Sequence, residues 1–94
     1  MITAIVLVTA AVDRITEVAE AIADIDGVSE VYSVAGDVDL VAIVRVRRHD
    51  ELHDVIPGRL NKVEGVLATT THIAFQAYSR HDLESTFSLG AGPA

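Results

Sequence analysis

The chain alternates between apolar runs of strand length and stretches in which apolar residues recur at helical spacing. Residues 2–9 consist of Ile, Val, Leu, Ala and Thr without polar alternation, and residues 40–46 have the same character except at Arg45. Continuous apolar runs of this length are typical of strands that are buried on both faces. Residues 28–35 alternate in polarity and residues 66–78 form a long run rich in β-branched and aromatic residues, so both are also predicted to be strands.

Two stretches place apolar side chains on one face of a helix. The first begins at Asp13, the predicted N-cap, and ends near Gly27. Its apolar face consists of Ile15, Val18, Ala19, Ile22 and Ala23. The second stretch has the apolar positions Leu52, Val55, Ile56, Leu60 and Val63. Pro57 interrupts it, and because an interior proline costs about 3 kcal/mol, we expect a kink or two short helical pieces.

The order of these elements, β-α-β-β-α-β, predicts an α+β fold of the ferredoxin-like type, a four-stranded antiparallel sheet with two helices on one face. Residues 36–39 (Gly-Asp-Val-Asp) are turn formers and are predicted to join the second and third strands as a hairpin. We expect the domain to span residues 1–79 and residues 80–94 to form a partly flexible C-terminal extension. The apolar residues of this extension, Leu83, Phe87 and Leu89, have near-helical spacing. The extension could dock on a neighbour as a short helix or have no fixed structure.

This arrangement leaves one apolar face of the sheet without a cover. The strands at residues 2–9 and 40–46 are apolar on both faces, but two helices on one side can bury only one face. Monomeric proteins rarely expose contiguous apolar patches larger than a few hundred Å². We therefore predict an obligate homodimer in which the sheets of two copies pack against each other.

The composition narrows the range of functions. Ninety-four residues fit one domain. A net charge of −7 and an aromatic content of 4% exclude a free-standing DNA-binding domain, since such domains need basic groups for phosphates. The absence of Cys excludes disulfides, thiolate metal sites and cysteine nucleophiles. No apolar run approaches the roughly 18 residues of a membrane span, and no basic n-region of a signal peptide precedes the first strand. A cytoplasmic location is expected.

Two short motifs follow each other along the chain in an order that is also found in a known protein family. Residues 34–46 read VAGDVDLVAIVRV, and after a predicted helix residues 63–73 read VEGVLATTTHI. This order resembles the ligand-binding domain of the Lrp/AsnC family, the feast/famine regulators of amino-acid metabolism. The positions that match the family pattern are Gly36, Asp37, Asp39, Gly65, Val66, Thr69 and Thr71, whereas Glu64 stands where the family usually has Pro.

The resemblance implies that an amino-acid effector binds at the junction between dimers, near the hairpin and the Thr-x-Thr strand. Chemically, the backbone at Gly36 could approach an α-carboxylate, and Asp37 or Asp39 could accept an α-ammonium group. Two hydroxyls on one strand face could also contact the carboxylate. The expected ligand-binding residues are Gly36, Asp37, Asp39, Thr69, Thr71 and His72. The alternative is that the first three form an ordinary turn, that the threonines are only strand formers and that His72 is an interface residue.

The resemblance also implies a particular type of family member. Family regulators carry an N-terminal helix-turn-helix domain before this module, whereas here the first predicted strand starts at residue 2. The expectation is a stand-alone type that does not contact nucleic acid or membrane. It would form dimers that associate further into a ring, and full-length regulators of the same family are possible partners. An ACT-like regulatory domain would give a similar description.

A histidine pair is the one candidate for a metal site. His49 and His53 are four residues apart, with Asp50, Glu51 and Asp54 around them, and that spacing can place two imidazoles on one ion. The same acids also suit the positive N-terminal end of a helix. No third, distant ligand stands out, so we predict no metal and no cofactor.

The sequence offers no recognisable catalytic constellation. It contains neither a nucleophile elbow around a serine nor a glycine-rich phosphate loop. The competing enzyme hypothesis is a dimeric ferredoxin-like monooxygenase or isomerase, whose sites usually need a cluster of His, Asn, Trp or Tyr. This chain has a single Asn, Asn61, and no Trp. We therefore predict no catalytic residues and no enzymatic activity.

Overall fold

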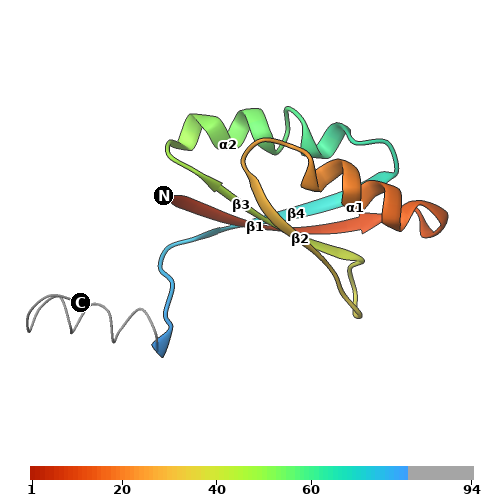
Figure 1. The fold of residues 1–94 in the computed structure, drawn as a ribbon, viewed down its shortest axis with the longest axis horizontal. Coiled ribbons are helices and arrows are strands. Elements are labelled where there is room, and N and C mark those ends of the chain that lie inside the picture. The colour runs from red at the N-terminus through yellow and green to blue at the C-terminus, as the bar shows by residue number, and fades with distance from the viewer. Residues whose placement is uncertain (81–94) are drawn as a thin grey trace, which may run out of the picture.

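Four strands and two helices follow one another in the order β-α-β-β-α-β in the computed structural model of the chain, which describes residues 1–80 (Figure 1). The strands are β1 (Ile2–Ala10), β2 (Val28–Ser33), β3 (Leu40–Val46) and β4 (Val66–Ala74). The helices are α1 (Ile15–Ala23) and α2 (His49–Val55), with short 3₁₀ turns η1 (Val12–Arg14) and η2 (Leu60–Lys62). The strands form one antiparallel sheet in the order β2-β3-β1-β4, and both helices cover the same face of it. The predicted ferredoxin-like fold is confirmed.

The core lies between the sheet and the two helices. Because side chains alternate along a strand, even-numbered residues of β1 and β3 point toward α1 and α2, and these positions are buried from Ala4 to Ala10 and from Leu40 to Val46. The helical side contributes Val18, Ile22, Leu52, Val55, Ile56 and Leu60. Burial of this apolar surface is the dominant favourable term in folding.

The opposite face of the sheet, called the open face below, is formed at its centre by Ile5, Leu7, Val41 and Ile43. Ile5 pairs with Ile43 and Leu7 with Val41, so these four side chains form a contiguous apolar patch. They are partly exposed, and no helix within residues 1–80 covers them (Figure 1). The predicted excess of apolar strand surface is therefore present in the structure.

Several predicted boundaries differ from the observed ones, and three of them have a visible cause. The last strand ends at Ala74 rather than at residue 78. Ala74 pairs with Thr3, and because β1 begins at Ile2, residues after Ala74 have almost no partner in β1. Asp13 lies inside η1 and makes no capping hydrogen bond; instead the backbone N–H of Arg14 donates to the carbonyl of Ala11. The first helix ends at Ala23, before Gly27.

The proline in the second helical stretch acts as predicted. The α-helical part ends at Val55, just before Pro57, and the chain resumes as the 3₁₀ turn η2, whose Leu60 is fully buried. The stretch therefore consists of two short pieces. The expected docking or disorder of the residues around Phe87 concerns residues 81–94, which lie outside the described part of the chain.

A polar group borders the apolar patch on the open face. The Tyr32 hydroxyl donates to Glu30 Oε2 at 2.6 Å, and Arg45 Nη1 donates to Glu30 Oε1 at 3.2 Å. Both bonds favour the charged carboxylate, first the one from Tyr32 and then the one from Arg45, so they lower the pKa of Glu30. The same bond to Glu30 raises the pKa of the Tyr32 phenol.

The Tyr32→Phe substitution tests this group. Removing the hydroxyl should raise the pKa of Glu30 toward its ordinary value, whereas Tyr78→Phe should leave it unchanged. A ¹³C NMR titration of the Glu30 carboxyl group measures both. Because the pKa of Glu30 is lowered on folding, any stabilisation from this group is present above the ordinary carboxyl pKa and is lost as the pH falls through the folded value. An identical Glu30 titration in wild type and Tyr32→Phe would contradict the assignment.

Candidate functional site

The hairpin between β2 and β3 closes back onto the central strand β1. The backbone N–H of Val34 donates to the carbonyl of Asp39 at 3.1 Å, and the N–H of Asp39 donates to the carbonyl of Val8 at 2.9 Å. At the tip, Gly36 has φ +141°, a conformation that favours glycine, and no heavy atom lies within 4 Å of the place a Cβ would occupy. The backbone at Gly36 is therefore open to approach from outside.

The two aspartates of the hairpin have different surroundings. Asp39 is half-buried, and its Oδ2 accepts a hydrogen bond of 2.9 Å from the backbone N–H of Ala10, at the end of β1. Its carboxylate thus ties the base of the hairpin to the central strand. Asp37 is exposed and makes no hydrogen bond or ion pair within the described chain. Of the two, Asp37 has the carboxylate that is free to contact a ligand.

The two threonines of the Thr-x-Thr motif lie on one face of β4, as their spacing predicts. Thr69 pairs with Val8 and Thr71 with Val6, so both point to the side of the sheet that carries the helices. The Thr69 hydroxyl donates to Asn61 Oδ1 at 2.9 Å, which occupies its hydrogen. Thr71 is exposed. The hydroxyl of Thr71 is therefore more accessible than that of Thr69.

His72 lies on the opposite side of the sheet from the two threonines. It pairs with Ile5, so it points toward the open face, where it is exposed. The structure does not bring it together with Thr69 and Thr71. Its position suits the interface role that the sequence left open for it.

The register of the strands brings the hairpin and the Thr-x-Thr motif to the same end of the molecule. Val8 pairs with Leu40 on one side and with Thr69 on the other, so the base of the hairpin is two strands from Thr69. Two strand spacings amount to roughly 10 Å. Neither of two cavities of about 380 and 390 Å³ in the structure is lined by any of the six expected ligand-binding residues.

One of those cavities lies at the other end of the sheet and has a charged lining. Its volume is about 380 Å³. The residues that line it include three arginines and three acids, namely Arg45, Arg47, Arg59, Asp26, Glu51 and Asp54. Sequence reasoning did not identify it. The only signal was the cluster of three arginines around the end of β3 at residues 45–48, which the fold brings beside the loop before β2.

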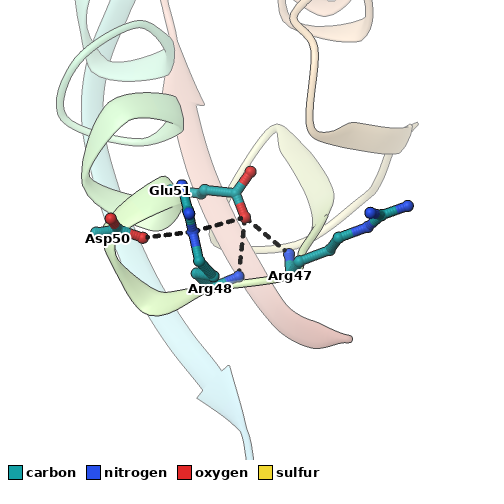
Figure 2. Close-up of polar contacts among 4 residues, drawn as sticks. All are labelled: Arg47, Arg48, Asp50 and Glu51. Atoms are coloured by element: carbon teal, nitrogen blue, oxygen red, sulfur yellow. Dashed lines mark hydrogen bonds and ion pairs between the residues drawn. The ribbon is translucent and has the colours of Figure 1, made fainter.

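Glu51 in this region has a structural role, which Figure 2 shows. Its Oε1 accepts hydrogen bonds from the backbone N–H groups of Arg47 at 3.1 Å and Arg48 at 2.9 Å, so it caps the start of α2. The Arg48 Nε lies 3.3 Å from Asp50 Oδ1. These contacts support the interpretation of the acids as helix-start residues. No group of three His, Asp or Glu residues in the described chain is placed to hold a metal ion.

The Asp39→Ala substitution separates a structural role from a ligand role. Loss of the carboxylate leaves the partly buried N–H of Ala10 without its partner, which should lower the free energy of unfolding by about 1–3 kcal/mol. Asp39→Asn keeps an acceptor oxygen and should lose less, and Asp37→Ala should stay within about 0.5 kcal/mol of wild type. Urea denaturation measures all three. Equal stabilities of Asp39→Ala and Asp37→Ala would refute the role of the bond.

Comparison with known proteins agrees with the geometry of the fold. The family model for the Lrp/AsnC ligand binding domain matches residues 3–83. No curated protein matches the chain. Within residues 1–80, no helix is both long and apolar enough to span a membrane.

Several solved structures are similar to this chain. TTHA0845 from Thermus thermophilus is 48% identical, with 85% of this chain and 100% of that chain covered and a TM-score of 0.80. The hypothetical protein PHS023 from Pyrococcus horikoshii is 30% identical, with 86% and 98% covered and a TM-score of 0.75. The feast or famine regulatory protein from M. tuberculosis, complexed with L-methionine, is 26% identical, with 85% and 54% covered and a TM-score of 0.68.

The matched structures thus include proteins of the same length as the domain and a regulator of which it spans about half. The family match covers the sheet, both helices and the two motifs noted in the sequence. The chain therefore belongs to the Lrp/AsnC ligand-binding domain family and is a regulatory effector-binding module.

Proposed function

We propose that this chain binds an amino acid and converts its presence into a change of assembly, and that it modulates transcription or amino-acid metabolism without contacting DNA itself. The observation that carries the proposal is the match of residues 3–83 to a ligand-binding domain family, one regulator of which has been solved with L-methionine. The family model describes a ligand-binding domain, and the M. tuberculosis match is named a regulatory protein, which supports a function without catalysis.

The ligand-contacting groups of the proposal are those that the fold leaves free. The open backbone at Gly36 and the exposed carboxylate of Asp37 lie at the hairpin. The exposed hydroxyl of Thr71 lies two strands from the hairpin base and two residues further along β4 than Thr69. A carboxylate accepts from an α-ammonium group in a charge-assisted bond. The hydrogen bond from Ala10 to Asp39 positions the hairpin groups. The bond from Thr69 to Asn61 positions the strand that carries Thr71.

The assembly proposed here is a homodimer through the open face. Ile5, Leu7, Val41 and Ile43 form an apolar patch of a kind that monomers rarely leave in water. A second copy is the simplest cover because the same patch on both copies is self-complementary about a two-fold axis. The hairpin borders one end of this interface, and in the proposed ring it would meet a second dimer.

In this scheme the effector acts by linkage. An amino acid held between dimers shifts the assembly only as far as its affinity differs between the assembled and the separate states. Since the site is incomplete in one copy, binding and assembly would stabilise each other. Full-length regulators of the family could join such an assembly and so have their DNA occupancy altered.

A thermal-shift screen of the twenty amino acids tests ligand binding. At a concentration of 100 times Kd, a ligand of the native state adds about 2.7 kcal/mol and raises the Tm. The amino acid found should bind Asp37→Ala at least tenfold more weakly by calorimetry, whereas Glu20→Ala, on the outer side of α1, should bind as wild type does. The proposal fails if no amino acid raises the Tm.

Sedimentation tests the dimer separately. Wild type should sediment as a dimer or larger species at micromolar concentration, and Ile43→Glu should sediment as a monomer because two charges would have to be buried at the interface. Ala21→Glu, on the exposed side of α1, should remain assembled. Circular dichroism confirms that each variant is folded. A wild-type monomer, or an assembled Ile43→Glu, would contradict the interface.

A further inference from the structure

The aromatic side chains of the described chain are all outside the core. Tyr32 is 51% exposed, Tyr78 is 81% exposed and Phe75 is 101% exposed. Aromatic side chains usually bury 150–250 Å² each and dominate the energetics of cores and interfaces. The core is built from Ala, Val, Ile and Leu, and these rings lie outside it. Exposed aromatic side chains of this kind are typical of protein–protein interfaces.

Two of these rings lie on one short segment, residues 75–78 (Phe-Gln-Ala-Tyr), called the aromatic arm below. The arm follows β4 directly, at the point where Ala74 makes the last pair with Thr3. Beyond this pair the arm leaves the sheet on the side away from the helices (Figure 1). The arm is therefore on the same side as the open face.

A groove lies between the arm and the open face. Its volume is about 390 Å³; Phe75, Gln76 and Ala77 line one side, and open-face residues of β1 and β3 line the other, namely Thr3, Ile5, Ile43 and Arg45. The Phe75 ring does not fill the groove of its own chain, since it is fully exposed. The arm carries no charged residue, and Ile5 and Ile43 give the groove an apolar lining beside Arg45.

We propose that the aromatic arm of one copy packs on the open face of a second copy, so that the two arms are exchanged across the dimer. This inference rests on the sheet-to-sheet dimer of the proposed function and adds to it the segment that closes the edge of the interface. Under a two-fold axis each copy offers one arm and one groove, so the contact occurs twice and closes on itself.

The length of the arm fits this exchange. Four residues span at most about 14 Å when extended, and two packed sheets lie about 10 Å apart. The arm can therefore cross the layer between the sheets and place Tyr78 against the partner. Buried aromatic residues at an interface commonly carry much of its binding energy, so the arm should matter to the dimer well beyond its share of the residues.

The first test is the sedimentation of the double variant Phe75→Ser/Tyr78→Ser. Its dimer dissociation constant should rise at least tenfold. The dissociated variant should keep the circular dichroism spectrum of the folded domain. Val12→Ser removes an apolar side chain that is 90% exposed in η1, beyond the end of β1 that is distant from the arm, and it should leave the dissociation constant unchanged. An unchanged constant in the double variant would overturn the proposal.

The second test uses the absence of cysteine from the chain. Phe75→Cys and Ile5→Cys chains, one of them isotope-labelled, are mixed and oxidised, and mass spectrometry identifies the pairs. A mixed disulfide between the two variants is expected, because each chain carries one thiol and can form it only with the partner. Ala21→Cys in place of Ile5→Cys should give none. Absence of the mixed disulfide from a dimeric protein would refute the arm exchange alone, whereas a monomeric wild type would refute both the dimer and the exchange.

Discussion

The constraint on which this structure depends is that two helices can bury only one face of a sheet whose central strands are apolar on both. Even-numbered residues of β1 and β3 fill the core beneath α1 and α2, and odd-numbered ones, from Ile5 to Leu7 and from Val41 to Ile43, face the other way. A domain of this size buries little apolar surface. The apolar side chains of an uncovered face therefore do not contribute the stabilisation that their burial would give. In the proposed dimer, the free energy of assembly would therefore add directly to the free energy of folding.

Local sequence pattern was sufficient for most of the fold. The strand at Leu40–Val46 has the predicted bounds, and Pro57 divides the second helical stretch as expected from its missing N–H. The larger error arose where a distant partner decides the outcome, and a smaller one arose within a single local turn. The end of β4 is set by the start of β1, which the composition of residues 75–78 cannot reveal. The start of the first helix was decided by a 3₁₀ turn closed at Ala11, against the capping preference of Asp13.

The candidate site was predictable to a similar degree. The two-residue period of a strand was enough to place Thr69 and Thr71 on one face, and the same rule puts the adjacent His72 on the other. The bond of Asp39 to Ala10 spans 29 residues of sequence and has no local signature. The charged cavity is equally non-local, because it exists only where the loop before β2 meets the end of β3.

The Asp39 carboxylate holds the last amide of β1, the strand that also supplies Ile5 and Leu7 to the open face. Any molecule that competes for that carboxylate releases the Ala10 amide, at the point where the pairing of β1 with β4 is already irregular. Fraying of the central strand would then begin at the hairpin end and travel toward the apolar patch of the open face. The exchange rate of the Ala10 backbone proton would thus report a molecule that takes the Asp39 carboxylate, with no probe attached.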